Sequence, residues 1–351
     1  MRVLVVNAGS SSLKLALLNE TDEVVDAVTL DRWSGEDETD DLGTFVERLP
    51  GVDAVGHRIV HGGGEFTGPV RVDAGVRDRI AGLAELAPLH QPRGVAGIDA
   101  VGSVLPEVPA VACFDTAFHH RLPAAAGTYA LPREWNQRWA LRRYGFHGLS
   151  HAHIARRVAE LAGPDRRIVS CHLGSGASLA AIRGDRSVDT TMGFTPLAGL
   201  VMATRSGDVD PGLVLWLLTR VDAAELSEVL EHRSGLAGLT GGSGDVRDIV
   251  GDPALRSALE VYLHRLRREI AAMAAAMNGL DVLVFTGGVG EHQPPIRAAA
   301  ADGLGFLGVR ISTAANDRGD LDVTAAGAAV RTLVIPARED VEIARQVRTV
   351  V

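Results

Sequence analysis

Lysine is almost absent from this sequence, because Lys14 is the only lysine and every other basic side chain is an arginine. A general bias towards arginine explains most of this pattern. Where a phosphate must be met, however, a compact and rotatable ammonium group can be needed in place of a planar guanidinium. Excess positive charge is also lacking, since the formal net charge is -9. This balance argues against nucleic acid or an anionic membrane as the main partner.

Cysteine and long apolar runs are scarce as well. The only two cysteines, Cys113 and Cys171, lie in apolar stretches typical of buried strands, so we expect free thiols in a reducing compartment. No apolar run approaches the length of a membrane span, and residues 1–6 are too short for the core of a signal peptide. We therefore expect a cytoplasmic protein that is not bound to a membrane. Its 351 residues, 46% of them hydrophobic, can supply the cores of two domains.

A glycine- and serine-rich stretch, Asn7-Ala-Gly-Ser-Ser-Ser-Leu-Lys14, joins two apolar runs at residues 3–6 and 13–18. The pattern predicts a β-hairpin whose turn presents backbone N–H and hydroxyl donors. Such a turn suits phosphate oxygens, although many turns of this composition have no ligand. A similar pattern returns at residues 168–179, where His172 takes the place of Asn7 and Gly174 that of Gly9. The repeat predicts two similar domains, each with a phosphate-facing hairpin, an architecture for a nucleotide.

Two charged residues lie where buried strands are expected. Arg58 falls inside the predicted strand 52–60, and Asp115 follows the predicted strand 108–114. A buried arginine requires an anion or a carboxylate, so Arg58 either contacts a ligand or forms a structural salt bridge. An aspartate at the carboxyl end of a central strand either meets a ligand or caps the next helix.

The second half of the sequence carries further glycine-rich segments. Residues 192–211 are irregular and contain Arg205, and long irregular segments in compact domains are usually functional. The strand predicted at 280–285 leads into a turn, Thr286–Glu291, whose glycines allow a ribose or a flat ring to approach the backbone. Neither the dinucleotide fingerprint nor the Walker A motif is present. His147 and His151 are spaced like zinc ligands, but Gly148 stands where a zinc protease needs glutamate.

Taken together, seven motifs resemble those of the acetate kinase family and occur in the family's order over nearly the whole chain. They are Asn7–Lys14, Gly56–Gly63, Phe114–His119, Arg142–Gly148, Cys171–Gly176, Thr204–Asp208 and Phe285–Glu291. The resemblance implies an α/β protein of the actin-like ATPase superfamily, with two duplicated ribonuclease H-like domains around a central nucleotide cleft. It implies residues 1–119 plus 341–351 as the first domain, residues 120–340 as the second, and a homodimer.

The resemblance also implies site residues. Asp115, His147 and Arg205 would be catalytic, while Asn7 and Glu339 would hold Mg²⁺ or Mn²⁺. A short-chain carboxylate would be bound by Arg58 in a pocket that further includes Val60, Leu89, Phe146 and Pro196. ATP or ADP would be bound by Ser10, Ser12, Lys14, His172, Leu173, Gly174, Ser175, Gly176, Asp245, Val246, Arg247, Gly287, Gly288, Val289, Gly290, Glu291 and His292.

The expected reaction is reversible, ATP-dependent phosphorylation of acetate to acetyl phosphate. Because a carboxylate is already ionised at neutral pH, it needs no general base, so we expect Asp115 to orient an arginine or a metal-bound water. A kinase for propionate or butyrate is the close alternative, and an ATP-gated scaffold is the distant one. Three positions depart from the family: Ser175, His292 and Gln91 stand where asparagine is usual. The segment before Val52 is also shorter than usual.

Overall fold

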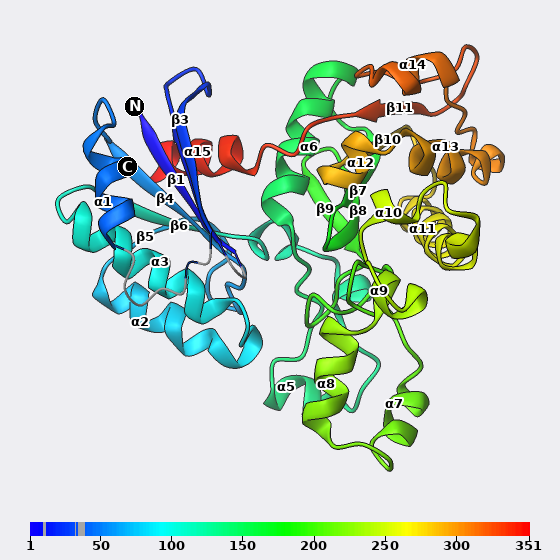
Figure 1. Cartoon of the computed structure of the whole chain (residues 1–351), viewed down its shortest axis with the longest axis horizontal. Helices are drawn as coiled ribbons and strands as arrows, with labels where there is room; N and C mark the ends of the chain where they lie inside the picture. The colour runs from blue at the N-terminus through cyan, green and yellow to red at the C-terminus, as the bar shows by residue number, and fades with distance from the viewer. Residues whose placement is uncertain (10–11, 32, 34–38) are drawn as a thin grey trace. The chain divides into compact units, whose positions relative to one another are not determined.

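The computed structural model describes residues 1–9, 12–31, 33 and 39–351 (Figure 1). Two compact units are present. Unit 1 contains Met1–His120, Phe146–His153 and Arg338–Val351, and unit 2 contains Arg121–Gly145 and Ile154–Ala337. Relative to the predicted domain boundaries, unit 1 thus gains residues 146–153 and begins its last segment at Arg338. Within the described ranges, no helix is both long and apolar enough to cross a membrane.

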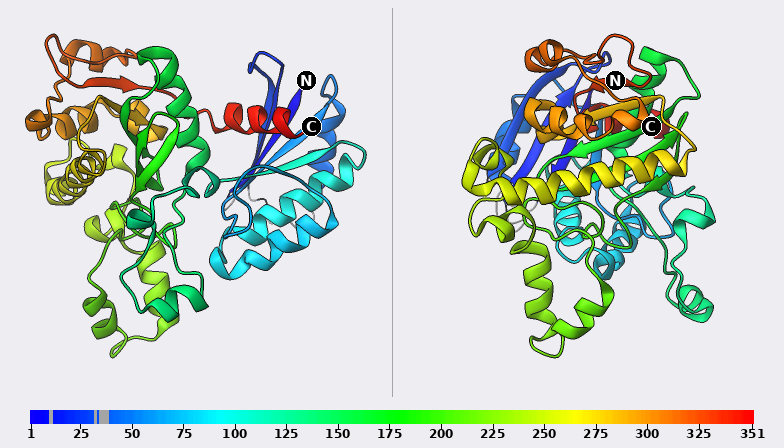
Figure 2. Two further views of the ribbon diagram at one scale, coloured as in Figure 1. Left: turned by 180° about the vertical axis from the view of Figure 1, so that it is seen from behind. Right: turned by 90° about the vertical axis from the view of Figure 1, so that its right-hand side faces the viewer.

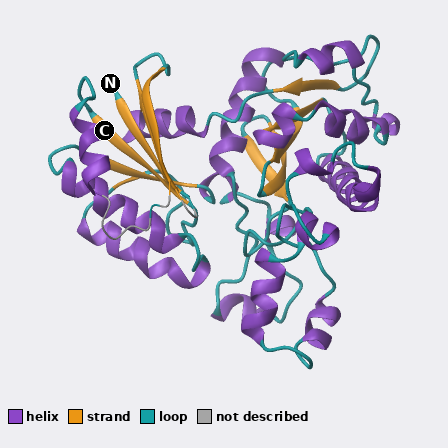
Figure 3. Ribbon diagram, viewed as in Figure 1, coloured by secondary structure: helices purple, strands orange, loops and turns teal. Residues whose placement is uncertain are grey.

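Unit 1 is a six-stranded sheet with helices on both faces, shown by the orange strands and purple helices of Figure 3. The strand order is β3-β2-β1-β4-β6-β5, with β1 antiparallel to β2 and parallel to β4, and with β4 parallel to β6. The strands are β1 (Val3–Ala8), β2 (Ser12–Leu18), β3 (Val24–Asp31), β4 (Ala54–Ile59), β5 (Val70–Arg71) and β6 (Ala110–Phe114). The helices are α1 (Thr39–Glu47), α2 (Ala74–Gly82), α3 (Gln91–Val104), α15 (Glu339–Val350) and the start of α6 (Gly148–Ala162).

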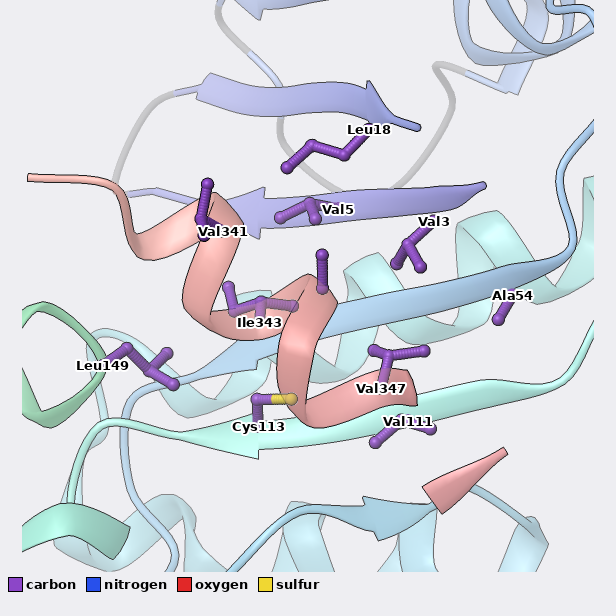
Figure 4. Close-up of a cluster of buried hydrophobic side chains, with 11 residues drawn as sticks. Val3, Val5, Leu18, Ala54, Val111, Cys113, Leu149, Val341, Ile343 and Val347 are labelled. Atoms are coloured by element: carbon purple, nitrogen blue, oxygen red, sulfur yellow. The ribbon is translucent and has the colours of Figure 1, made fainter. Parts of the chain in front are cut away.

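The core of unit 1 explains why its segments are so far apart in the sequence. Helix α15 packs Val341, Ile343 and Val347 against one face of the sheet, where they meet Val3 and Val5 of β1 (Figure 4). On the opposite face, strand residues that alternate with these pack against α1 and α3. Burial of apolar side chains on both faces is the main stabilising contribution to such a layered domain.

Unit 2 repeats the topology of unit 1. Its sheet has the order β11-β10-β7-β8-β9, in which β7 is antiparallel to β8 and parallel to β10, and β10 is parallel to β11. Strands β7, β8, β10 and β11 therefore correspond to β1, β2, β4 and β6, which confirms the predicted duplication. The strands are β7 (Arg167–Leu173), β8 (Ala177–Arg183), β9 (Arg186–Thr190), β10 (Val282–Thr286) and β11 (Arg331–Val334).

The helices of unit 2 include α11 (Arg256–Ala276), the long yellow helix in the right-hand view of Figure 2, which packs on β7 and β8. The predicted turn after β10 is wrong in one respect, since residues Gly287–His292 form a short helix, α12. The remaining helices are α4 (Ala124–Gly127), α5 (Arg133–Arg138), α7 (Pro211–Leu217), α8 (Ala223–His232), α9 (Gly235–Thr240), α10 (Val246–Ile249), α13 (Pro294–Asp302) and α14 (Thr313–Arg318).

Candidate active site

Three functional candidates of unit 1 lie at the carboxyl ends of adjacent parallel strands. In the register, Val6 pairs with His57 and Ile59 with Phe114, so the residues that follow along β1, β4 and β6 come together at one edge of the sheet. Asn7, Arg58 and Asp115 occupy this edge. Carboxyl ends of parallel strands are where α/β proteins bind their ligands.

Arg58 is the centre of this group. Its Nε and Nη2 donate to the two carboxylate oxygens of Asp115 at 3.2 and 2.6 Å, and its Nη1 donates to Asn7 Oδ1 at 3.2 Å. The Glu339 carboxylate lies 3.6 Å from Nε. Burial alone would lower the pKa of Arg58, but the charges of Asp115 and Glu339 raise it above its ordinary value, so the guanidinium stays protonated. Of the two groups that Asp115 was expected to orient, an arginine or a metal-bound water, the structure shows the arginine.

The first hairpin brings Lys14 into register with Asn7. Residues directly opposite in an antiparallel pair project to the same face, so the exposed Lys14 side chain shares a face with Asn7. Gly9 N donates to Ser12 O at 2.8 Å and closes the turn. Ser10 lies outside the described residues.

His147 has an unusual backbone conformation next to Asp115. Its φ of 54° is in the left-handed region, which non-glycine residues adopt at an energetic cost. The following amide, Gly148 N, donates to Asp115 O at 2.9 Å and so fixes the start of α6 to the end of β6. Phe146 is buried, with its ring 5.5 Å from that of His61. Val60 is half-buried directly after β4, and Leu89 is largely exposed.

Unit 2 contains a pocket of about 580 Å³ at the corresponding edge of its own sheet. It brings together eight of the predicted nucleotide residues from three segments of the chain: Gly174, Ser175, Asp245, Val246, Arg247, Gly288, Val289 and His292. The predicted residues His172, Leu173, Gly176, Gly287, Gly290 and Glu291 lie on the same segments but not on the pocket wall.

Asp245 and Arg247 form an ion pair at the N-terminus of α10. The Asp245 side chain accepts from Arg247 N at 2.9 Å and caps the helix, while the Arg247 guanidinium donates to both carboxylate oxygens. These hydrogen bonds lower the pKa of Asp245 to about 2, so this carboxylate is an acceptor at any physiological pH. Such an acceptor suits a ribose hydroxyl.

Six further residues of the pocket wall were not predicted from the sequence. Thr204 and Ala203 precede Arg205, and Gly244 precedes Asp245, so their neighbours in the sequence could have indicated them. Tyr262 is one of the buried residues of α11, a position that gives no signal in the sequence, and its buried hydroxyl lacks a hydrogen-bond partner among the described residues. The full set is Ala203, Thr204, Leu236, Gly244, Tyr262 and Gln293.

Arg205 of unit 2 is half-buried without a carboxylate partner in the part of the chain that the structure describes. Its Nη1 approaches Pro196 O at 3.4 Å and Met202 Sδ at 3.9 Å. Burial lowers the pKa of this guanidinium, and Glu231 only partly offsets that effect. A backbone bond from Met202 N to Arg205 O closes the loop on itself, and one from Ser234 N to Thr204 O holds it on the connection between α8 and α9. A fixed cation of this kind can bind an anionic ligand.

Two oxygen-donor side chains next to Arg58 are the expected metal ligands. Asn7 Oδ1 and the Glu339 carboxylate both approach the guanidinium, and oxygen ligands are those that Mg²⁺ prefers. The described residues hold no group of three or more histidine, cysteine, aspartate or glutamate side chains arranged for a metal. One carboxylate with an amide fits the mode in which Mg²⁺ keeps water and substrate phosphates as its other ligands.

The duplicated sheet topology, with candidate phosphate-facing residues after corresponding strands, is that of the actin-like ATPase superfamily. The sequence profile of the Acetokinase family matches residues 37–345, and the chain belongs to this family. An acetate kinase from Coprothermobacter proteolyticus is 41% identical over 396 aligned positions, which cover 100% of this chain and 99% of the relative.

Solved structures agree with this assignment. A propionate kinase from Francisella tularensis superposes with a TM-score of 0.94 at 33% identity and covers 100% of both chains. An acetate kinase from Porphyromonas gingivalis superposes with a TM-score of 0.90 at 34% identity, over 99% of both chains. The predicted family and fold class are therefore confirmed.

Proposed function

We propose that the protein transfers the γ-phosphoryl group of ATP to acetate and forms acetyl phosphate and ADP, reversibly. Membership of the Acetokinase family supports this reaction. The observation that carries the proposal at the level of residues is the pairing of Arg58 with Asp115, because it creates a fixed, permanently charged group at the carboxyl edge of the sheet.

Arg58 retains donors for the substrate. A guanidinium has five N–H groups, and Asp115 and Asn7 accept from three of them. The remaining hydrogens, one on Nη1 and one on Nη2, form a fork that can hold an acetate carboxylate in two parallel hydrogen bonds. Asp115 is then a positioning residue, which orients the fork and takes no proton.

In the transfer step, a carboxylate oxygen forms a bond to the γ-phosphorus while the bond from that phosphorus to the bridging oxygen of ADP breaks. The attacking oxygen carries a negative charge before the transfer and the leaving oxygen of ADP carries one after it, so neither has to lose or gain a proton. Catalysis then depends on alignment and on stabilising the charge of the phosphoryl oxygens. We assign this stabilisation to the Arg205 guanidinium and to a hydrogen bond from His147.

The nucleotide is assigned to the pocket of unit 2. The backbone amide of Gly288, in the first turn of α12, suits phosphate oxygens, and Asp245 suits the ribose. Asn7 and Glu339 would hold Mg²⁺ or Mn²⁺, which would neutralise phosphate charge when bound. Ser12, Lys14 and His172 are proposed as further phosphate contacts.

The acid that the enzyme prefers is set, in this proposal, by Val60 with Leu89, Phe146 and Pro196. A propionate kinase among the similar structures keeps the longer acid as a second candidate. The test is hydroxylamine trapping of acyl phosphate formed from ATP with acetate, propionate or butyrate. The highest kcat/KM with acetate supports the proposal, and a preference for butyrate would contradict it.

We further propose that the protein is a cytoplasmic homodimer. The free, buried Cys113 and Cys171 agree with a reducing compartment. Around α7, apolar side chains of Leu213, Leu215 and Trp216 are exposed, and a second copy of the chain would cover them. Sedimentation should give a dimer for the wild type and a monomer for Leu215→Arg. The matched variant Phe306→Arg, at an isolated exposed position of the same unit, should remain dimeric.

A further inference from the structure

Glu291 lies on α12, beside the nucleotide pocket, but its carboxylate does not line the pocket. Gly288, Val289 and His292 of the same short helix line the pocket, whereas Glu291 does not. Its Oε1 instead accepts a hydrogen bond from Ala337 N at 2.9 Å. A carboxylate that accepts from a backbone amide forms a charge-assisted bond, which is stronger than a bond between neutral groups.

The backbone of α12 is held in place by hydrogen bonds from Arg297. This fully buried arginine donates through Nη1 to the carbonyl oxygens of Gly290 and Glu291 at 2.9 and 2.7 Å. Its Nε and Nη2 donate to Asn316 Oδ1 and O on α14, at 2.7 and 2.9 Å. The end of α12 is therefore anchored to α14. A shift of the α12 backbone at Glu291 would therefore change the position from which its carboxylate reaches Ala337 N.

Ala337 lies just before a proposed ligand of the metal. Ile335 N still donates to Phe285 O at 3.0 Å and so continues the pairing of β11 with β10. Ala337 is the last residue of unit 2, and the chain then enters unit 1 at Arg338. Glu339, two residues after Ala337, begins α15 and lies 3.6 Å from Arg58.

We propose that Glu291 is a positioning residue that couples nucleotide binding in unit 2 to the first turn of α15, through its hydrogen bond to Ala337 N. This inference rests on the proposed function for the identity of the ligand, ADP or ATP. When the nucleotide contacts α12, the Glu291 carboxylate holds the backbone of residue 337 and thereby restrains the position of Glu339. The coupling passes along the covalent chain.

Hydrogen–deuterium exchange of the full-length protein tests the coupling directly, with ADP and magnesium chloride as the probe. In the wild type, ADP should slow amide exchange both over residues 287–292 and over residues 337–342, the latter by about 5-fold or more. In Glu291→Ala, ADP should slow exchange only over residues 287–292. Glu291→Gln keeps the Oε1 acceptor and should retain most of the wild-type response.

A second variant removes the same hydrogen bond from the donor side. Ala337→Pro lacks the backbone N–H, whereas Ala337→Gly keeps it, so only the proline variant should lose the response of residues 337–342. Glu260→Ala, which breaks an exposed pair with Arg256 on α11, is the control for loss of a surface carboxylate. The proline variant also decides the question if Glu291→Ala does not fold.

The possible outcomes separate two different errors. If ADP leaves residues 287–292 unchanged in the wild type, the proposed nucleotide site is wrong. If ADP protects residues 287–292 but not 337–342 in the wild type, or protects both equally in Glu291→Ala and Ala337→Pro, the coupling role of Glu291 is wrong while the proposed function stands.

Discussion

Two arginines that the sequence marks as unusual have opposite surroundings. Arg58 is held by Asp115, Asn7 and Glu339, and its pKa is raised, whereas Arg205 is half-buried near a carbonyl oxygen and a sulfur, and its pKa is lowered. A buried charge without a counter-charge is costly unless a ligand supplies one. We therefore expect Arg205 to interact most strongly with the phosphoryl group, and Arg58 to be oriented before any ligand arrives.

Replacement of Arg205 by alanine should lower kcat much more than it changes either KM. Loss of an arginine that stabilises the transition state of phosphoryl transfer costs on the order of 10³-fold or more in rate. Steady-state kinetics of Arg205→Ala, with Arg205→Lys as the charge-conserving comparison, measures this effect. A folded Arg205→Ala enzyme with near-normal kcat would remove Arg205 from the mechanism.

Val60 controls the length of the acid in our proposal, because it follows Arg58 by two residues and should meet the alkyl end of a carboxylate held there. Val60 itself lies one residue beyond β4, which ends at Ile59. One methylene is worth roughly 1–3 kcal/mol of discrimination, so wild type should use propionate at about a tenth to a hundredth of its acetate efficiency.

Val60→Ala should narrow or invert this ratio, chiefly through the KM for the acid and without a change in the KM for ATP. The measurement is kcat/KM for acetate and propionate in both proteins. An unchanged ratio in the variant would show that Val60 does not contact the alkyl group.

Among the secondary-structure elements, the bounds of the strands are predicted well from the sequence. The contacts between residues on different strands and helices are predicted poorly. Strands β1, β4, β6 and β10 were predicted to within about two residues because each is an apolar run that ends at a polar or glycine-rich segment. Helix α12 was missed, since three of its six residues are glycine, the poorest helix former after proline.

Contacts between residues that are far apart in the sequence were harder to predict. Asp115 and Arg58 are 57 residues apart, so their hydrogen bonds follow from the register of β4 and β6 and could not be read from spacing. The sequence did limit Asp115 to a few partners, an arginine among them. The Glu291 side chain was assigned to the nucleotide from its motif alone, because the contact with Ala337 N depends on the tertiary fold.

The start of α6 is packed so closely on the end of β6 that Gly148 cannot be replaced without a shift. A Cβ built there would overlap the carbonyl oxygen of Asp115 and approach Phe118 Cβ at 2.9 Å. Gly148→Ala should therefore displace His147 or Asp115 and lower both kcat and stability, the latter by about 1–3 kcal/mol.

The matched control for this prediction is Gly102→Ala in α3, where an added Cβ meets open space. That variant should be neutral or stabilising by about 0.5–1 kcal/mol, since alanine is the better residue inside a helix. Chemical denaturation and steady-state kinetics of both variants provide the comparison. Equal effects of the two substitutions would contradict close packing at Gly148.

At the scale of the whole molecule, unit 1 contains an acid-sensitive core. Burial lowers the pKa of His57, His61 and His119 to about 4 each, below the ordinary value of 6.5. In the unfolded chain these residues bind protons near pH 6.5, whereas the folded protein excludes protons until about pH 4. The contribution of these three neutral histidines to the free energy of unfolding is thus fully present above pH 6.5 and is lost as the pH falls from 6.5 to 4.

Each histidine contributes a slope of up to about 1.4 kcal/mol per pH unit within this window. His57→Gln cannot titrate and should reduce the slope of unfolding free energy against pH by up to about this amount. Urea denaturation at several pH values between 4 and 7 measures both slopes. A wild-type stability that stays constant from pH 7 to 4.5 would contradict the neutral, buried state of these side chains.

The position of α15 in the chain has a consequence for biosynthesis. This helix covers the face of unit 1 that bears Val3 and Val5, yet the whole of unit 2 lies between β1 and α15 in the sequence. During synthesis on the ribosome, one apolar face of the sheet in residues 1–120 therefore stays exposed until α15 is made. More than 200 further residues are synthesised in that interval. Domains usually fold as units as they emerge, and exposed apolar surface at this stage favours aggregation. Completion of the first unit thus depends on the last helix, and chaperone binding to the nascent chain should end only when α15 has docked.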